Sequence, residues 1–415
     1  MRELPDGWAR VPLGDLVKTI RPRVSPHEAD SLPFVGMDHV EPHTMRLLGT
    51  VPATSMKSAA VRFEPGDVLY GRLRPYLNKV YSPDFHGLAS AEFIPMTPSE
   101  RLDADYLRYV LNSADFVKFA SGLNTGDRPR VDFKQLASFP VLLPPLSEQA
   151  RVTLFVHNQL TRLHVASDYL RSARQRIVRY RDAVLTAESL GRSPGIADRQ
   201  PSQAGADGLP ELPAAWRWAT IDRVAKRVTV GHVGPMKTEY VDEGVPFLRS
   251  QNVRANRFEA SGLKYISRTF HRSLAKSTLL PGDVVVVRSG DVGTACVIPE
   301  ELSEANCADL VIIQRPTDVD PRFISYYLNS AARRLIAAGR VGVALTHFNT
   351  RSVAGLPIPV PPPEEQSAII QRVEYQLSVL DQLSREIAGA ERHARALRNS
   401  VLTAALRGEI RTAAR

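Results

Sequence analysis

The sequence has few of the residues that build disulfide or metal scaffolds. Only Cys296 and Cys307 are cysteines among 415 residues, which excludes a disulfide framework and argues against a cysteine-based metal cluster. No apolar run approaches the ~20 residues that a membrane-spanning helix needs. The first residues, MRELPDGW, lack the apolar segment of a secretion signal. We therefore expect a cytoplasmic protein.

Sequence motifs of catalysis are missing as well. There is no GxxxxGK[ST] phosphate loop, no GxGxxG after a predicted strand, no HExxH and no Asn-Pro-Pro-aromatic motif of amino-methyltransferases. The 10 histidines are not spaced with carboxylates as metal ligands. Asp67 and Asp283 each follow Pro-Gly, which favours a turn role over catalysis. We expect no catalytic residue, no metal site and no cofactor bound by this chain.

The charge of the sequence points to a class of partner. Lys and Arg number 53 and Asp and Glu number 44, which gives a net charge of +9. Such an excess favours a polyanionic partner, either nucleic acid or an acidic membrane surface. A soluble protein whose basic charge has no such role is the alternative.

A proline-rich segment that occurs twice organises the chain. Residues 140–149 read PVLLPPLSEQ and residues 357–366 read PIPVPPPEEQ, at an offset of 217. Consecutive prolines favour extended backbone and cannot continue a sheet ladder. Ser147 can cap a helix start, and Pro363 suits a first helical position. Each segment is predicted to be a hinge between a globular lobe and a long helix.

Further segments recur in the same order. They are LPxxW at 4–8 and 212–216, PGDV at 65–68 and 281–284, a Tyr/Leu-rich segment at 103–113 and 320–330, and RxxVLTA at 181–187 and 398–404. The offsets run from 208 to 217. Matched segments in one order identify a tandem duplication, with insertions inside the lobes.

The duplication divides the chain into five predicted parts. They are lobe 1 (1–145), a first long helix (146–190), a flexible Gly/Pro/Ser-rich linker (191–211), lobe 2 (212–362) and a second long helix (363–410). Short apolar runs between Pro and Gly predict strands in lobe 1, whereas residues 103–119 read as one helix. The fold class is α+β: two mixed α/β lobes, each followed by a long helix.

Both long helices carry heptad stripes at the same register. The predicted seam comprises Val156, Leu163, Leu170, Ile177 and Val184 in the first helix and Val373, Leu380, Ile387, Ala394 and Val401 in the second. Residues three positions further on, such as Tyr180 and Leu397, are expected to complete it. The pattern predicts that the helices pair, the alternative being that each helix packs on its own lobe.

Basic and polar residues cluster on predicted loops at matched places in the two lobes. Arg can bind guanine in a bidentate manner, Lys can bind phosphate and Tyr can pack on sugar or base. The candidates in lobe 1 are Arg72, Arg74, Tyr76, Lys79, Asn124, Arg128, Arg130 and Lys134. Those in lobe 2 are Arg249, Gln251, Asn252, Arg254, Arg288, Ser289, Arg340, Thr346, His347, Asn349 and Arg351. Singly each fits a solvated surface role, but as groups on matched loops they favour DNA contact.

The repeated lobes, the two proline hinges, the helix ends VLTAE and VLTAA and the loop GRLRPYLNK resemble the specificity subunit of type I restriction–modification systems. The resemblance covers essentially the whole chain. It implies that each lobe is a target recognition domain for one half of a split, asymmetric sequence in double-stranded DNA. It also implies that the two helices form an antiparallel coiled coil. The chain itself would be non-catalytic.

The same resemblance implies partners. Two methyltransferase subunits would dock on the helices, and two motor/nuclease restriction subunits could join them. S-adenosylmethionine, ATP and Mg would be bound by those subunits and not by this chain. Two other function classes stay open: a coiled-coil protein-interaction scaffold without sequence-specific DNA binding, and a DNA-modifying enzyme with an unrecognised active site.

Overall fold

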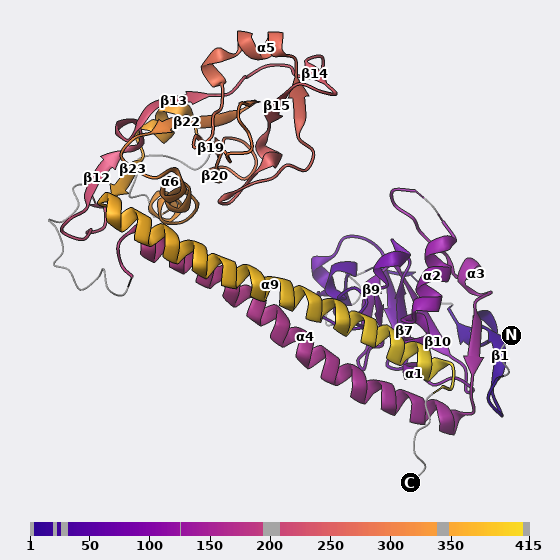
Figure 1. The fold of residues 1–415 in the computed structure, drawn as a ribbon. Coiled ribbons are helices and arrows are strands. Elements are labelled where there is room, and N and C mark those ends of the chain that lie inside the picture. Colours follow the sequence, from indigo (N-terminus) through magenta and orange to yellow (C-terminus); the bar gives the residue numbers. More distant parts are fainter. Residues whose placement is uncertain are drawn as a thin grey trace. The chain divides into compact units, whose positions relative to one another are not determined.

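The computed structural model describes residues 4–19, 23–25, 32–124, 126–193, 208–337 and 348–409. The chain forms two compact units (Figure 1). Unit 1 comprises Met1–Arg171 and Ala388–Arg415, and unit 2 comprises Ser172–Ile387. Each unit contains one lobe and a stretch of both long helices. No described helix is long and apolar enough to cross a membrane.

Lobe 1 has three sheets within its described residues. A ribbon has the order β1-β11, a four-stranded sheet β2-β10-β7-β8 and a five-stranded sheet β3-β6-β9-β4-β5. The strands are β1 (Ala9–Pro12), β2 (Val17–Lys18), β3 (Arg23–Val24), β4 (Pro33–Val35), β5 (Val51–Pro52), β6 (Ala60–Phe63), β7 (Val68–Gly71), β8 (Val80–Tyr81), β9 (Gly87–Ser90), β10 (Phe93–Pro98) and β11 (Pro140–Leu143). The helices are α1 (Ala104–Leu111), α2 (Ala114–Gly122), α3 (Phe133–Leu136) and the long α4 (Leu146–Ser189).

Lobe 2 repeats this plan. The ribbon is β12-β23, the matching four-stranded sheet is β13-β22-β19-β20, and two more sheets have the orders β14-β18-β15-β21 and β16-β17. Its strands are β12 (Arg217–Thr220), β13 (Ala225–Val230), β14 (Tyr240–Val241), β15 (Val245–Leu248), β16 (Val253–Arg254), β17 (Arg257–Phe258), β18 (Lys264–Ile266), β19 (Val284–Val287), β20 (Ala295–Val297), β21 (Asn306–Cys307), β22 (Leu310–Pro316) and β23 (Pro357–Val360). Its helices are α5 (Arg268–Ser273), α6 (Pro321–Tyr327), α7 (Arg333–Ala337), α8 (Thr350–Ala354) and the long α9 (Pro363–Leu406). The α+β fold with two lobes and two long helices is confirmed.

The repeated Pro-Gly-Asp segments are turns. The Asp67 carboxylate accepts the backbone N–H of Glu64 at 2.9 Å, and the Asp283 carboxylate accepts that of Leu280 at the same 2.9 Å. Both aspartates are buried before the central strands β7 and β19. The predicted turn role is confirmed.

One helix predicted in lobe 1 is two. Residues 103–119 form α1 and the start of α2, with a break at Asn112 and Ser113. The Ser113 side chain accepts the Phe116 N–H at 3.2 Å and caps α2. A serine that caps a new helix start ends the first helix, which an apolar pattern alone did not reveal.

Each unit places both long helices against the core of its lobe. In unit 1, Val156 and Leu160 of α4 and Leu402 of α9 belong to one buried cluster with Tyr106 and Phe116 of the lobe. In unit 2, Leu185 of α4 and Ile369 and Val373 of α9 join Trp216 and Phe323 in the same way. The helices therefore pack on the lobes and on each other. The predicted pairing of the helices and the alternative, packing of a helix on its own lobe, both occur.

The helices run antiparallel where they meet. In unit 2, Arg372 donates two hydrogen bonds to the buried Glu188, at 2.7 and 3.1 Å, and Arg181 pairs with Asp381. Moving back along α4 from residue 188 to 181 corresponds to moving forward along α9 from 372 to 381. The antiparallel pairing of α4 and α9 is confirmed (Figure 1).

The predicted seam residues are covered to different degrees. Val156, Val184, Val373 and Leu380 are buried, and the other six are half-buried. The expectation for the positions three residues further on is wrong, because Tyr180 and Leu397 are exposed. Positions four residues further on face inwards instead, as Leu160 and Leu377 do. Several of these positions are polar, such as Ser167 and Ser384, so a search for apolar residues did not identify them as part of the seam.

The predicted cap of the first long helix is wrong, although both helices begin where expected. Helix α9 begins at Pro363, as predicted, and α4 begins at Leu146, so Ser147 lies inside the first turn and is not its cap. The Pro145 carbonyl accepts the backbone N–H groups of Glu148 and Gln149, both at 2.9 Å.

A buried glutamine fastens each lobe to its helix. The Gln149 carbonyl accepts the N–H of Asp103 at 2.8 Å, and its amide donates to the carbonyls of Arg101 and Pro144 at 2.9 Å. Gln149 has 0% exposure. A carboxamide is the one side chain of this length that accepts and donates at once. We name these three bonds the glutamine clamp.

The clamp is repeated in lobe 2. Gln366 accepts from the N–H of Asp320 at 2.8 Å and donates to the carbonyls of Asp318 and Pro361 at 2.9 Å. Because each clamp satisfies three backbone groups beside a proline hinge, it fixes the angle at which helix and lobe join.

We expect Gln149→Ala to lower the free energy of unfolding by about 2–4 kcal/mol, because it leaves three backbone groups unsatisfied. Gln366→Ala should have a similar effect. Denaturant unfolding of the full chain measures it. Gln175→Ala, on an exposed position of α4, is the control and should change stability by no more than about 0.5 kcal/mol. Equal stability of the clamp variants and this control would contradict the role of the clamp.

Candidate nucleic-acid interface

Two predicted loops of lobe 1 lie side by side. The backbone N–H of Arg74 donates to the Pro129 carbonyl at 2.8 Å, and the N–H of Val131 donates to the Arg72 carbonyl at 3.0 Å. A bridge between Leu73 and Arg130 continues this contact. The loop after β7 and the loop before α3 therefore form one surface.

Three predicted side chains of this surface face solvent. Tyr76 is 47% exposed, and Arg128 and Lys134 are exposed without a hydrogen bond or ion pair to any described residue. Arg130 instead pairs with Glu92, and the Asn124 amide donates to the Arg130 carbonyl. Arg128, Lys134 and Tyr76 are thus the side chains free to meet a ligand.

The remaining lobe 1 candidates are used inside the protein. Arg72 is half-buried and its Nε donates to the Val131 carbonyl at 3.2 Å. Lys79 donates to the Met37 carbonyl at 2.5 Å, and burial lowers the pKa of its ammonium. Arg74 adopts a left-handed backbone with φ of 52° and its Nε is buried without a partner. Lys79 is therefore not kept among the proposed contacts.

In lobe 2 one candidate is clearly structural. Asn252 has 0% exposure, and its amide donates to the carbonyl of Glu259 at 2.8 Å while its oxygen accepts the Arg249 N–H at 3.1 Å. Its expected role as a base reader does not fit this burial. Gln251 and Arg254 are exposed neighbours on the same segment. Arg249 and Gln251 both donate to the Gly262 carbonyl, at 2.7 and 3.2 Å.

The loop after β19 is matched to the loop after β7. Arg288 pairs with Asp309 at 3.1 Å and the Ser289 hydroxyl donates to the same carboxylate, so part of its charge is neutralised within the lobe. A Cβ at Gly293 would lie 3.5 Å from the Phe348 ring, which places this loop beside the segment that leads into α8. In lobe 2 the described end of the second predicted loop, at Phe348, therefore lies beside the first loop.

Only part of that second segment is described. Asn349 caps α8 by accepting the Ser352 N–H at 2.9 Å, and Arg351 is exposed. The predicted contacts Arg340, Thr346 and His347 lie outside the described residues.

Comparisons with known proteins agree with this architecture. Residues 235–388 match the family described as "Type I restriction modification DNA specificity domain". The EcoBI specificity subunit of Escherichia coli is 24% identical over 65% of this chain, and the chain spans 58% of that relative. The EcoEI specificity subunit of the same species is 21% identical, with 97% of this chain and 83% of the relative covered. The chain is therefore similar to type I specificity subunits, with one relative matching almost its whole length.

Solved structures agree with this fold. A chain from a study of complex assembly and conformational transition of the type I R-M system superposes with a TM-score of 0.76 at 20% identity, over 99% of this chain and 100% of that chain. The HsdS subunit from Thermoanaerobacter tengcongensis gives a TM-score of 0.51 at 22% identity, with 99% of each chain covered. At these identities the likeness concerns the fold. The roles of individual residues are therefore argued from the contacts within this chain and not transferred from these structures.

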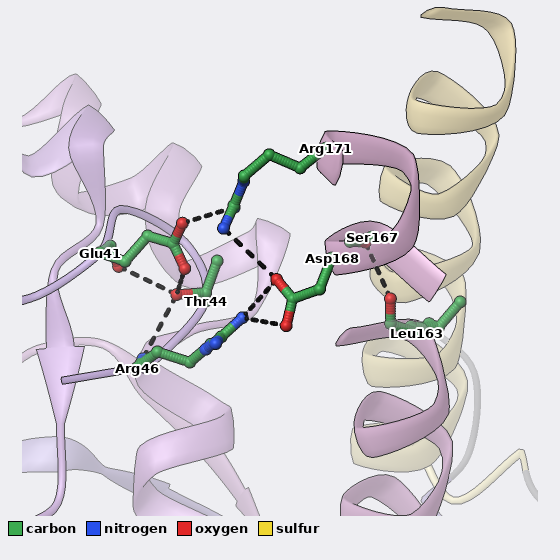
Figure 2. A network of polar contacts seen from close by, with 7 residues as sticks. All are labelled: Glu41, Thr44, Arg46, Leu163, Ser167, Asp168 and Arg171. Carbon is green, nitrogen blue, oxygen red and sulfur yellow. Dashed lines mark hydrogen bonds and ion pairs between the residues drawn. The ribbon is translucent and has the colours of Figure 1, made fainter. Parts of the chain in front are cut away.

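A polar network that sequence reasoning missed joins lobe 1 to α4 (Figure 2). Arg46 binds both carboxylate oxygens of Asp168, at 2.9 and 3.1 Å, and Arg171 binds Glu41 at 2.8 Å and Asp168 at 3.3 Å. Thr44 donates to Glu41 at 3.0 Å and completes the loop end of the network. Its lobe residues and its α4 residues are more than 120 positions apart in sequence, so no local signal identifies the network. The Arg46 guanidinium lowers the pKa of Asp168.

A buried arginine lies in the same part of unit 1. Arg398 of α9 donates to the Asn112 side chain, its Nε is buried without a partner, and burial lowers its pKa to about 10. The repeat places Arg398 at the position of Arg181 and His164 at that of Asp381. In unit 2 this pair is an ion pair, whereas in unit 1 the arginine has a histidine in place of the carboxylate.

This exchange predicts acid sensitivity. Burial, followed by Arg398, lowers the pKa of His164 below its ordinary 6.5, and burial likewise lowers that of His43. Below about pH 6.5 the unfolded chain therefore binds more protons than the folded chain. Stability present above that pH should be lost progressively as the pH falls.

His164→Asp should supply the missing carboxylate, raise the free energy of unfolding at pH 8 by about 1–2 kcal/mol and weaken the acid sensitivity. Urea unfolding between pH 8 and pH 5 measures both effects. The matched control is Asp381→His, which removes the equivalent carboxylate beside Arg181 and should destabilise. A loss of stability at pH 8 in His164→Asp would contradict the comparison.

Proposed function

We propose that this chain is the non-catalytic DNA sequence-specificity subunit of a type I restriction–modification complex. It recognises an asymmetric bipartite target in duplex DNA, with one half-site for each lobe. The observation that carries the proposal is the repeat: the two lobes share one plan, lobe 1 joins two loops into one surface, and the side chains on the matched loops of lobe 2 differ. Lobes 1–145 and 212–362 are the proposed recognition domains.

Direct reading of bases needs side chains that reach the major groove. In lobe 1 we assign this role to Arg128, Lys134 and Tyr76, which are exposed on the joined loops. The other lobe 1 candidates, Arg72, Arg74, Asn124 and Arg130, support these loops through the contacts described above.

In lobe 2 the exposed side chains of Gln251, Arg254 and Arg351 are the proposed readers. Arg249, Arg288 and Ser289 hold protein partners, as Gln251 does, and all four would have to exchange them for DNA. Arg340, Thr346 and His347 remain predictions from the sequence. Different residue types on the two lobes give two different half-sites.

The antiparallel helices support a spacing role and a docking role. We propose that they hold the two half-sites at a fixed separation and leave the intervening bases unread. Each unit exposes apolar side chains on these helices, with Tyr169 73% exposed in unit 1 and Tyr375 71% exposed in unit 2. Such side chains suit a protein partner better than solvent. Two methyltransferase subunits, one for each unit, are the proposed occupants.

The chemistry is assigned to partners. We propose that adenine methylation with S-adenosylmethionine, and any ATP- and Mg-dependent cleavage by two restriction subunits, take place in those subunits, in the cytoplasm. This assignment rests on the likeness of the chain to type I specificity subunits.

The decisive experiment exchanges one lobe. The chain is co-expressed with its methyltransferase subunit, and methylated adenines are mapped across the host genome. We expect a split, asymmetric motif. Replacing residues 212–362 with the lobe 2 of another family member should change one half of the motif and leave the other half and the spacer length unaltered.

Two results would contradict the proposal. A stable complex that methylates no defined motif would favour a protein-interaction scaffold without sequence-specific DNA binding. A lobe exchange that alters both halves at once would contradict the assignment of one half-site to each lobe.

At the residue level, Arg128→Ala should weaken binding to the mapped target by about 5–100-fold and relax base preference only in the half-site of lobe 1. Electrophoretic or anisotropy titrations of the complex on single-base variants measure this. The control Arg62→Ala removes an exposed arginine of β6 outside the loops and should leave base preference unchanged. Unchanged discrimination at every position in Arg128→Ala would remove this residue from the interface.

A further inference from the structure

Four basic residues of lobe 2 line one hollow of about 330 Å³. Lys226 and Arg227 come from β13, Lys276 from the 3₁₀ turn Ala275–Ser277, and Arg315 from β22. All four are exposed, and none forms an ion pair with a described residue. Residues so far apart in sequence give no local motif.

The one acid at the hollow does not neutralise its rim. Asp283 is 2% exposed, and its two oxygens accept the backbone N–H groups of Leu280 at 2.9 Å and Arg315 at 2.8 Å. The carboxylate is therefore used to hold two backbone segments together beneath the basic side chains. Burial also raises the pKa of this carboxyl group.

Arg315 is held in an unusual conformation at this place. Its φ is 51°, in the left-handed region that non-glycine residues rarely adopt. The bond from its N–H to Asp283 fixes this conformation, and strained backbone persists where the surroundings enforce it. The repeat places Pro98 at the same position in lobe 1, so lobe 1 has no arginine there.

The lining restricts the ligand. The residues around the hollow include no aromatic side chain, so a nucleotide base or other ring has nothing to stack on. What the hollow offers is a concentration of Lys and Arg donors without carboxylate competition. That chemistry suits a phosphate group.

We propose that this hollow binds a backbone phosphate of duplex DNA next to the half-site read by lobe 2. The inference rests on the proposed function and adds a contact that no base-reading loop supplies. Asp283 precedes β19 and Arg288 follows it, and a four-residue strand spans about 13 Å. This is comparable to the ~12 Å width of the major groove. If the loop after β19 enters the major groove, the hollow at the other end of β19 lies about one groove width away. A phosphate that flanks the groove would then lie at the hollow.

The test uses the assembled complex of this chain with its methyltransferase subunit. The variant carries Arg227→Gln and Lys276→Gln, and its affinity for duplex DNA is measured over a range of salt concentrations. We expect affinity to fall about equally for all sequences, and the slope of log affinity against log salt to decrease by ~0.9 for each phosphate that is no longer neutralised. The methylated motif should be unchanged.

Two further variants serve as matched controls. Arg272→Gln removes from α5, outside the hollow, one exposed positive charge that pairs with no described residue, and it should leave the salt slope unchanged. Lys276→Arg keeps the charge and should bind as the wild type does. Thermal unfolding of the variants checks that each remains folded.

The other outcomes overturn the inference in distinguishable ways. An unchanged salt slope with weaker subunit assembly would make the hollow a surface for an acidic protein segment. If inorganic phosphate at matched ionic strength stabilises the wild type and not the double variant, while the salt slope is unchanged, the hollow binds free phosphate. Failure of the wild-type complex to bind any duplex would refute the proposed function itself.

Discussion

The glutamine clamp constrains the rest of this molecule. Gln149 and Gln366 each bind one N–H and two carbonyls at the place where a lobe ends and a long helix begins. Prolines beside the clamp cannot donate, so a side chain must supply the bonds that a sheet ladder would otherwise provide. With the joint fixed, the position of a recognition loop depends on the direction of a helix. That dependence is what a protein needs if it compares two separated DNA segments.

Around this shared joint the two units diverge. Unit 2 holds its helices with the ion pairs Arg372–Glu188 and Arg181–Asp381. Unit 1 buries Arg398 near His164 and ties its lobe to α4 through the network of Figure 2. The repeat thus keeps the same architecture in both halves of the chain while the polar contacts differ. Unequal lobes suit a target whose two halves are unequal.

Much of the architecture could be predicted because it depends on local or repeated patterns. The proline hinges, the heptad stripes and the matched segments gave the α+β duplication with two long helices. The side of the helix that completes the seam could not be predicted from apolar residues. Four positions after Leu163 and Leu380 stand Ser167 and Ser384, whose hydroxyls donate to the carbonyls of those leucines. The break at Ser113 was missed for a similar reason, since apolar periodicity continues across it. The basic hollow of lobe 2 depends on residues 226, 276 and 315, which only the tertiary fold brings together.

The distribution of both helices over both units also has a consequence for synthesis. The core of lobe 2 is built from residues between Leu185 and Val373, which form one continuous stretch of chain. The core of lobe 1 includes Leu402, Ala405 and Leu406, which follow that whole stretch. During synthesis, all residues of the lobe 2 core leave the ribosome before the last residues of the lobe 1 core do. The core of the N-terminal lobe is therefore completed last, and part of its apolar surface stays exposed until the end of α9 has been made.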